Sequence, residues 1–318
     1  KDGTVPFNNT APSYYGRIDS WAGHEEMFFD ISRSLVEAGL PLESLLTEMA
    51  PGQFEITFAP QRGVASPDSV VVAKEALRKC LGKASMMPTF MSTPNEKEHS
   101  NGFHFNHSLW KINDNSQGNQ GSANIDSHGT NDDGNLELKS TNSFYDPTDA
   151  ILLSPTARHW IAGLVKHAPG LALLSSPTIN CTRRLQDELS PKGANWGVEN
   201  RAAFLRVRNS KCNVYIEDRL PSSASNPYLV VAGVVAAGMD GIRKKLECPP
   251  PMDQSAPPLP TTLDDAVYCL EKDTVLIEAL GKDLVSTFLS LTRKAIEKNE
   301  SGDLEDIDRQ RKIYFTCI

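Results

Sequence analysis

The chain has 318 residues, of which 39% are hydrophobic, enough for one large domain or two ordinary ones with a sizeable core. Asp and Glu number 40 against 32 Lys and Arg, so the net charge is −8, and no dense basic run could neutralise several adjacent phosphates. These numbers exclude nucleic acid as an expected partner. The 6 cysteines are spread out without a CxxC pair, which favours a reducing, cytoplasmic compartment over a disulfide scaffold.

Neither the N-terminal sequence nor the most apolar stretch resembles a targeting or membrane segment. The N-terminal sequence KDGTVPFNNTAPSYYGRID lacks a basic region followed by an apolar run, and we interpret it as a cut end rather than a secretory signal. The apolar stretch YLVVAGVVAAGMDGI is interrupted by Asp240 after about a dozen residues, too few to cross a bilayer. It predicts a buried helix and no membrane insertion.

Hydrophobic periodicity predicts helices and strands that alternate along the chain. Helices are expected at 24–39, 66–82, 154–174, 226–246 and 274–299. Strands are expected at 54–60, 84–91, 102–110, 202–209 and 214–220. The strands are short and alternate polar with apolar residues, which favours an antiparallel or mixed sheet with helices on one face and a cleft on the other. The predicted fold class is α+β.

Two segments have the composition of loops. Residues 111–143 are almost all Asn, Gly, Ser, Asp, Gln and Lys, which cannot bury enough apolar surface to offset their ordering entropy. We therefore predict a disordered polar insertion there. The segment CPPPMDQSAPPLP, residues 248–260, is rich in proline and predicts an extended loop on the surface.

The stretch HSNGFHFNHSLW, from His99 to Trp110, separates different chemistry onto the two faces of a strand. One face carries Gly102, His104, Asn106 and Ser108. The other face carries Phe103, Phe105 and His107. The polar face suits a metal and phosphate site or its remnant. The alternative is a half-buried strand whose histidine makes an ordinary hydrogen bond.

Carboxylates on neighbouring strands extend this candidate site. Glu55 and Glu217 lie on polar faces of their predicted strands, and Glu48 precedes a Pro-Gly break that could turn it toward the same space. Together with His104, such oxygen-rich ligands suit Mg²⁺ or Mn²⁺ better than Zn²⁺. The alternative is that these groups form ion pairs with arginines, namely Arg201, Arg206 and Arg219.

Several motifs resemble those of the glutamine synthetase family, in the same order along the chain. Glu48-Met-Ala-Pro-Gly-Gln-Phe-Glu55 resembles the family's Glu-x-Ala-Pro-Gly-Gln-x-Glu element. Asn101-Gly-Phe-His104 with Ser108-Leu-Trp110 resembles its Gly-x-His-x-x-x-Ser-Leu-Trp strand, with one residue altered. Further similar elements are PTIN at 177–180 with RRL at 183–185, WGVENR at 196–201 with Arg206, EDR at 217–219, NPYL at 226–229 and AGMDGI at 237–242. The resemblance runs from about Tyr14 to the C-terminus, interrupted by the polar insertion.

The resemblance implies the fold of the family's catalytic domain, in which a curved, mostly antiparallel sheet lines a cleft and is flanked by helices. Residues 1–318 would be this C-terminal domain, without the family's small N-terminal β-grasp domain and without its Glu-x-Glu strand. In the family, twelve such subunits form two hexameric rings. They use ATP and two divalent metals to activate glutamate as γ-glutamyl phosphate, which ammonia then attacks.

The resemblance also implies roles for individual residues. The metals would be held by two pairs, Glu48 with Glu55 and His104 with Glu217. The ATP phosphates would be held by Arg201 and Arg206, with Ser108 and Asn106 on the adenosine side. Arg184 would grip the substrate carboxylate, and Arg219 would stabilise the transferring phosphoryl group.

Four positions, in three places along the chain, depart from the family pattern at the substrate and phosphate side. Ser190 stands where the family has the flap glutamate that takes a proton from ammonium, and a hydroxyl cannot replace a carboxylate base. The pair His99-Ser100 replaces an Asn-Gly that helps to bind glutamate, and Tyr215 replaces an arginine on the ATP side. These changes predict a catalytically inactive homologue that requires no cofactor, with residual weak Mg²⁺, Mn²⁺ or ATP binding at vestigial sites.

Within the family, the chain resembles a non-catalytic group of proteins found in the vertebrate eye lens. The resemblance rests on these departures, on the Asn- and Ser-rich insertion and on the ending RKIYFTCI. That resemblance implies a structural or chaperone-like dodecamer in the cytoplasm of lens fibre cells. Its partners would be intermediate-filament proteins such as vimentin and the lens beaded-filament proteins. The alternative is an active ATP-dependent ligase joining glutamate to ammonia or another amine, and Ser190 discriminates between the two. A third reading is a nucleotide-binding module in which Ser108, Arg201 and Arg206 hold phosphates without turnover.

Overall fold

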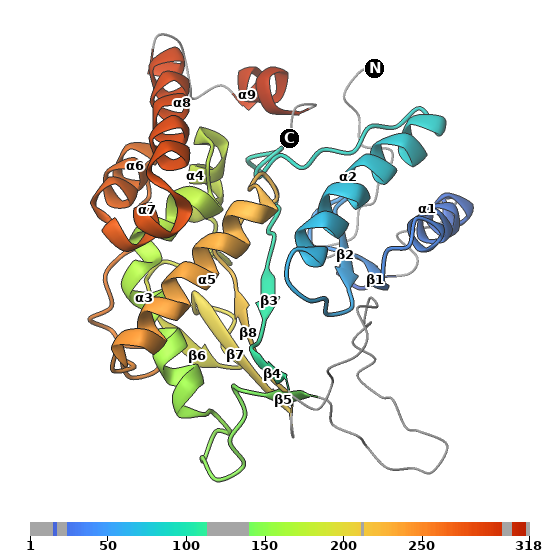
Figure 1. Ribbon diagram of the computed structural model, residues 1–318. Helices are drawn as coiled ribbons and strands as arrows, with labels where there is room; N and C mark the ends of the chain where they lie inside the picture. Colours follow the sequence, from blue (N-terminus) through green and yellow to red (C-terminus); the bar gives the residue numbers. More distant parts are fainter. Residues whose placement is uncertain (1–14, 18–23, 113–139, 211–212, 301–306, 316–318) are drawn as a thin grey trace, which may run out of the picture.

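The computed structural model describes residues 15–17, 24–112, 140–210, 213–300 and 307–315 (Figure 1). The helices in these ranges are α1 (Glu25–Glu37), α2 (Ala65–Lys83), α3 (Pro155–Ser175), α4 (Ile179–Gln186), α5 (Pro227–Lys244), α6 (Leu263–Lys272), α7 (Thr274–Leu280), α8 (Lys282–Glu300) and α9 (Ile307–Tyr314). The strands are β1 (Leu42–Thr47), β2 (Phe54–Phe58), β3 (Phe105–His107), β4 (Trp110–Ile112), β5 (Ser140–Asn142), β6 (Trp196–Val198), β7 (Leu205–Ser210) and β8 (Asn213–Asp218).

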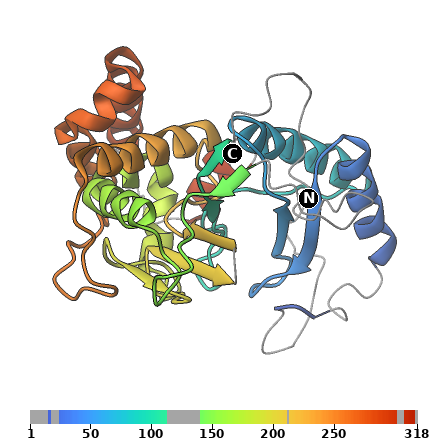
Figure 2. The same cartoon turned by 60° about the horizontal axis from the view of Figure 1, so that its bottom comes forward.

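The described strands form a central sheet and two small ribbons. The central sheet has the order β3-β8-β7-β6, in which β6 and β7 are parallel and the other pairs are antiparallel. The ribbons β1-β2 and β4-β5 are antiparallel hairpins. Figure 2 shows the β1-β2 hairpin with α1 and α2 as a separate layer beside the main body. The α+β class and the mixed, mostly antiparallel sheet are confirmed, but the single curved sheet is divided into three in the described residues.

Most of the predicted elements are present, and the differences have local causes. The predicted helix at 274–299 is divided into α7 and α8 by Gly281, whose φ is 93°. The predicted strand at 84–91 is wrong: this segment pairs with no strand, since Pro88 has no backbone N–H and Ser85 has a φ of 58°. The eight-residue helix α4 was not predicted, because two turns give too little periodicity.

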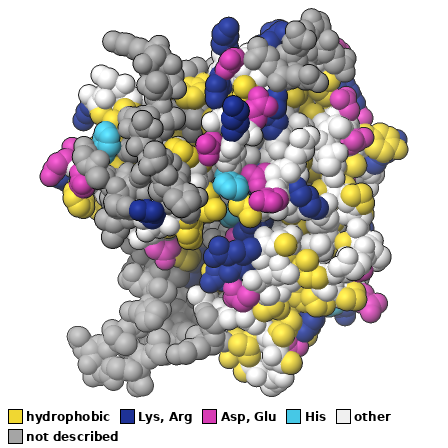
Figure 3. All heavy atoms as spheres, turned by 180° about the vertical axis from the view of Figure 1, so that it is seen from behind, with side chains coloured by type: hydrophobic (Ala, Val, Ile, Leu, Met, Phe, Trp, Pro, Cys, Tyr) yellow, Lys and Arg dark blue, Asp and Glu magenta, His cyan; other side chains and the backbone are white. Residues whose placement is uncertain are grey.

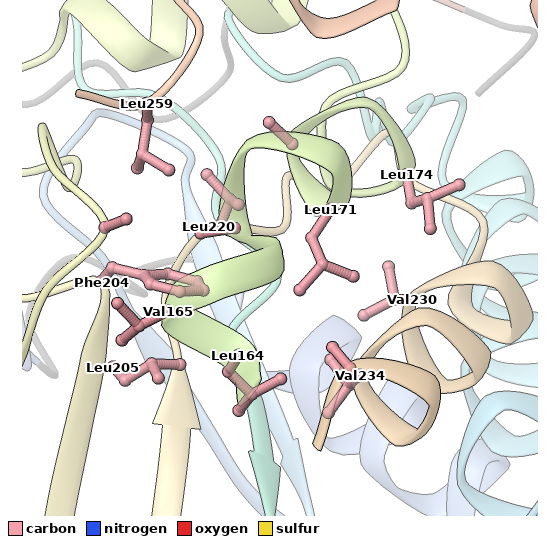
Figure 4. Packing of buried hydrophobic residues seen from close by; sticks show 14 of the residues in the cluster. Leu164, Val165, Leu171, Leu174, Phe204, Leu205, Leu220, Val230, Val234 and Leu259 are labelled. Carbon is pink, nitrogen blue, oxygen red and sulfur yellow. The ribbon is translucent and has the colours of Figure 1, made fainter. Parts of the chain in front are cut away.

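The main core lies between the central sheet and the helix pair α3 and α5. Val165 of α3 lies next to Leu205 of β7, and Leu164 of α3 points toward Val234 of α5 (Figure 4). The N-terminus of α3 is capped by Ser154, whose hydroxyl accepts a hydrogen bond from Ala157 N–H, with a proline at the first position. The apolar stretch that suggested a buried helix forms α5. None of the helices in the described ranges combines the length and apolar character that a membrane span requires.

Helices α3 and α5 approach each other at glycines. A Cβ at Gly241 of α5 would lie 2.0 Å from the carbonyl oxygen of His159 and 2.8 Å from the nitrogen of Gly163, both in α3. A Cβ at Gly163 would lie 2.2 Å from the carbonyl oxygen of Ala237. Since real Cβ contacts are not this short, the two helix backbones touch only because neither residue has a side chain.

A buried histidine links α3 to α5 and α7. His167 of α3 has its Nδ1 2.6 Å from Asp273 Oδ2 and its Nε2 3.1 Å from Asp240 Oδ2. Lys166 and Lys244 also contact the Asp240 carboxylate. Burial lowers the pKa of His167, but the two hydrogen-bonded aspartates outweigh it and raise the pKa above its usual value. An imidazole between two carboxylates donates through both nitrogens only when it is protonated.

This geometry predicts a pH-dependent contribution of His167 to stability. Because its folded-state pKa is raised, the contribution should be full below the unfolded value of about 6.5 and decline as the pH rises through the folded-state value. We expect His167→Gln to lower the free energy of unfolding by about 2–3 kcal/mol near pH 6, and by less at pH 9. Urea unfolding of both proteins across this range measures the difference. A difference that does not change with pH would contradict the prediction.

The two loop predictions have different outcomes. Residues 113–139 lie outside the described residues, so disorder of that part stays a prediction. At its ends the predicted insertion is wrong, because Lys111 pairs with Thr141 in the β4-β5 ribbon and Asn142 donates to the carbonyl of Val214 at 2.8 Å. The proline-rich loop runs along residues 192–196, with Ala194 N–H donating to the carbonyl of Pro257. It is not extended throughout, because it turns at 251–255, where Met252 has a φ of 53°, and it is not wholly on the surface, because Leu259 is buried in the core.

Candidate functional site

The candidate site is built on the face of the central sheet opposite the core, which we call the polar face. Asn106 on β3, Glu217 on β8 and Arg206 on β7 lie side by side in the strand register. Adjacent residues point the other way, and His107 accordingly contacts the core, where it accepts a hydrogen bond from Trp160 Nε1 at 3.0 Å. Burial lowers the pKa of His107 to about 4. The predicted division of faces in residues 102–110 is therefore confirmed.

Glu217 lies at the centre of a charged cluster on the polar face. Its Oε1 is 3.2 Å from His104 Nδ1 and accepts a hydrogen bond from Arg219 at 2.9 Å. Its Oε2 accepts a hydrogen bond from Arg206 at 3.0 Å. Burial alone would raise the pKa of Glu217, but His104, Arg219 and Arg206 lower it to about 2. The carboxylate is therefore held ionised by groups of its own chain.

The arginines of this cluster are also buried and only partly satisfied. Arg206 and Arg219 are each 8% exposed. Arg206 makes a second ion pair with Glu199 at 2.8 Å. The Nε atoms of Arg206 and Arg219 are buried and have no hydrogen-bond partner among the described residues. Two guanidinium groups with a spare N–H donor each are typical of places that hold an anion.

The hairpin β1-β2 supplies the other two carboxylates. Glu55 lies on β2 opposite Leu46, and Glu48 directly follows β1. Burial raises the pKa of Glu55, and the charge and hydrogen bond of the neighbouring Glu48 raise it further. The charges of His104 and Glu217 also act on Glu55, so the hairpin faces the cluster around Glu217.

The predicted metal ligands do not form a metal centre in this arrangement. In the part of the chain that the structure describes, no three His, Cys, Asp or Glu side chains converge as a metal would require. Glu48 and Glu55 face each other, and Glu217 has both oxygens engaged by arginines. The donors present among the described residues therefore do not by themselves make up a two-metal site. The alternative prediction, that the carboxylates form ion pairs with arginines, is confirmed for Arg206 and Arg219, which both pair with Glu217. Arg201 is instead exposed in the turn after β6.

On the predicted substrate side, Arg184 is engaged by the backbone. This residue of α4 is 3% exposed and donates to the carbonyl oxygens of Arg219 at 2.8 Å and Leu220 at 2.9 Å. Burial lowers its pKa to about 10. Gly102 lies against it, since a Cβ there would be 3.3 Å from Arg184 Nη2 and 3.0 Å from His104 Nε2.

Sequence reasoning missed Asp187, which joins two of the altered positions. Its Oδ2 accepts a hydrogen bond from Ser100 N–H at 3.1 Å and lies 3.6 Å from His99 Nδ1. Its Oδ1 accepts one from Leu189 N–H at 2.9 Å. Ser190, 6% exposed, follows in the same turn, and its N–H donates to the Asp187 carbonyl. The sequence signal was the Asp itself, at the end of a helix. An Asp side chain there often accepts a hydrogen bond from the backbone N–H two residues later and so forms a turn.

The predicted nucleotide side contains an arginine that the sequence analysis also missed. Arg208 pairs with Tyr215 across β7 and β8, with its guanidinium 5.9 Å from the ring centroid. The Ser108 hydroxyl accepts a hydrogen bond from Trp110 Nε1 at 2.9 Å. The two-residue spacing of Arg206 and Arg208 was the signal, since it places both on one face. Seen from behind, basic, acidic and His side chains lie next to one another near the middle of the surface (Figure 3).

Comparison with known proteins gives the family. Residues 6–129 and 135–311 match the family model described as glutamine synthetase, catalytic domain. The chain is 31% identical over 280 residues to glutamine synthetase of Thermus thermophilus, covering 83% of this chain and 57% of that protein. It is 26% identical over 290 residues to human lengsin, covering 87% and 52%. The chain thus spans less than two thirds of the length of these relatives.

Solved structures agree in fold. A GmaS/ADP complex superposes with a TM-score of 0.78 at 26% identity, covering 96% of this chain and 66% of that one. A structure described as a novel glutamine synthase homolog gives a TM-score of 0.79 at 24% identity, covering 98% and 68%. The family match and these superpositions confirm the resemblance seen in the motifs: the chain belongs to the glutamine synthetase family, through that family's catalytic domain.

Proposed function

We propose that this protein is a non-catalytic member of the glutamine synthetase family that acts as a structural or chaperone-like assembly protein. The observation that carries the proposal is the state of Glu217, whose two carboxylate oxygens are engaged by Arg206 and Arg219. A carboxylate compensated in this way attracts a divalent cation weakly. The proposed role requires no cofactor, and any binding of Mg²⁺, Mn²⁺ or ATP would be residual.

The substrate side supports the same proposal. A buried hydroxyl at Ser190 offers no base near neutral pH. The backbone N–H of Ser100 and the imidazole of His99, which stand where the family motif has Asn-Gly, contact Asp187 of the same chain. These groups are therefore directed at each other rather than at a ligand.

The finer part of the proposal rests on the altered site residues together with the presence of lengsin among the relatives. Lengsin of rat, mouse and human is 26% identical to this chain, and several glutamine synthetases are 28–31% identical, so overall identity does not favour lengsin. On this proposal the protein works in the cytoplasm of lens fibre cells. Its partners would be intermediate-filament proteins such as vimentin and the lens beaded-filament proteins, and binding of the purified protein to vimentin filaments in a sedimentation assay would test this.

The lack of catalysis has a direct test. Purified full-length protein supplied with glutamate, ammonia, ATP and Mg²⁺ or Mn²⁺ should show no γ-glutamyl transfer or glutamine formation above background. A bacterial glutamine synthetase under the same conditions is the positive control. Turnover within about a hundredfold of that control, a loss smaller than removal of a positioned base usually causes, would overturn the proposal.

Divalent metal should bind weakly. We expect titration calorimetry with Mn²⁺ to give a dissociation constant weaker than micromolar, because no three candidate ligands converge among the described residues and Glu217 is compensated by neighbouring arginines. Glu217→Gln is the matched control and should change the titration little. A micromolar or tighter site that Glu217→Gln abolishes would contradict this prediction.

Assembly into a dodecamer is also proposed from the family resemblance. We expect mass photometry of the full-length protein to show particles of twelve subunits in two hexameric rings, because closed symmetric assembly reuses one interface. Electron micrographs with and without ATP should show the same double ring. A population of monomers and dimers alone at micromolar concentration would exclude this assembly.

A second candidate function, an ATP-dependent ligase or a nucleotide-binding module, is favoured by the arginines. Arg206 and Arg219 each keep a buried Nε–H without a partner among the described residues, which suits an anionic phosphate. The superposition with a GmaS/ADP complex supports the same candidate. Calorimetry with ADP separates the readings: binding lost in Arg206→Gln, without turnover, would support a nucleotide-binding module.

A further inference from the structure

The C-terminal helix α9 is joined to the Asp187 turn by a continuous set of contacts. Gln310 of α9 is 2% exposed, and its Oε1 accepts hydrogen bonds from Asn180 Nδ2 at 2.9 Å and Arg183 Nε at 3.2 Å, both in α4. Next to it, Arg311 donates to the carbonyl oxygen of Pro94 at 2.6 Å. The helix is therefore held both to α4 and to the segment that leads into residues 99–101.

Asn180 carries the connection from α9 to residues 93–101. It is fully buried, its Oδ1 accepts a hydrogen bond from Thr93 N–H at 2.7 Å, and its Nδ2 donates to the Thr93 carbonyl at 2.9 Å. The Thr93 hydroxyl lies 2.9 Å from the Ser100 hydroxyl. Ser100 N–H then donates to Asp187. The Asn180 amide therefore uses both of its N–H donors and its oxygen, which fixes its orientation. A movement of Gln310 on one side should then displace Thr93 on the other.

The Asp187 turn is itself fixed from within. Lys192 donates through Nζ to the carbonyl oxygens of Leu185 at 2.8 Å and Asp187 at 2.6 Å. The Asp187 turn is thus held by its own hydrogen bonds, and the Asp187 carboxylate connects it to residues 99–101. Residues 99–101 also contact the loop between β1 and β2, where Gln53 Nε2 donates a hydrogen bond to Asn101 Oδ1 at 2.7 Å.

We propose that α9 is an intramolecular strap: by docking through Gln310 and Arg311 it holds residues 99–101 against the Asp187 turn, and its release loosens that contact. The inference rests on the proposed function in one respect: the strap closes the side of the site at which an active enzyme of this family would bind its substrate. It is an occluding contact built from the chain's own residues. Anything that binds α9 in preference to this docking would open the contact.

Hydrogen exchange of the full chain tests the strap. Gln310→Ala removes two buried hydrogen bonds, and we expect exchange in peptides covering 93–101 and 187–190 to become at least about tenfold faster, with β7 and β8 unchanged. Lys312→Ala, on the exposed side of α9, is the matched control and should change nothing. Faster exchange confined to α9 would overturn the proposal.

A second variant keeps the test independent of α9 folding. Asp187→Ala breaks the last contact and should raise exchange at 99–101 and 187–190 to a similar extent, while α9 stays protected. If Asp187→Ala leaves 99–101 protected, the carboxylate does not hold the two pieces together and the strap is excluded. Since exchange is measured without turnover, a ligase activity found in the assay above would sink the proposed function and leave this result standing.

Discussion

Gly241→Ala should be among the most destabilising single-methyl changes in this protein, lowering the free energy of unfolding by about 3 kcal/mol or more. Alanine normally stabilises a helix relative to glycine by about 0.5–1 kcal/mol. Here the added Cβ would lie 2.0 Å from the carbonyl oxygen of His159, which is backbone and cannot rotate away. Helices α3 and α5 would have to separate, and the core that they cover would lose its close packing.

Gly82→Ala is the matched control for this substitution. Gly82 lies in α2, and a Cβ there would meet nothing within 4 Å. We expect it to raise the free energy of unfolding by about 0.5–1 kcal/mol. Urea unfolding followed by circular dichroism gives both values. Equal effects of the two substitutions would show that α3 and α5 do not touch at their glycines.

The fold was predictable where hydrophobic residues recur with the helical period over a long segment. The helices α1, α2, α3 and α5 were predicted to within a few residues, because their apolar positions and their start and stop residues agree. The β1 strand was missed, since its sequence LESLLT contains no aromatic residue and only one β-branched residue, Thr47. The division at Gly281 was missed because the helical pattern continues on both sides of it. Such boundaries depend on backbone geometry that periodicity does not carry.

The faces on which the candidate residues lie were predictable, but the contacts of these residues were not. Alternation correctly placed His104 and His107 on opposite faces, and strand pairing brought Glu217 beside Arg206. Whether Glu217 faces a metal or arginines could not be read from spacing, because both arrangements use the same residues on the same face. Asp187 was missed because its partner, the backbone N–H of Ser100, leaves no mark in the sequence. Contacts between a side chain and a distant backbone group become visible only in three dimensions.

Ser190→Glu alone should leave ligase activity at background in the full-length protein. A positioned proton acceptor is typically worth about 10²–10⁴ in rate, so if Ser190 alone had abolished catalysis, this substitution would recover a large part of it. Three other positions argue against recovery. His99 and Ser100 contact Asp187 and hold the substrate side closed, and Tyr215 leaves the predicted nucleotide side without the family's arginine. Groups that act as a unit do not restore function one at a time.

The combined change His99→Asn, Ser100→Gly, Ser190→Glu and Tyr215→Arg is the informative comparison. It restores the family residue at these four positions, and Ser100→Gly keeps the backbone N–H that donates to Asp187. We therefore expect at most trace turnover from it, because the Asp187 contact and the arginine pairs around Glu217 remain. Adding Asp187→Ala should increase that trace, since it frees residues 99–101. Substantial activity in Ser190→Glu alone would mean that substrate and nucleotide still bind productively, and the protein would then be a ligase that lost its base rather than an assembly protein.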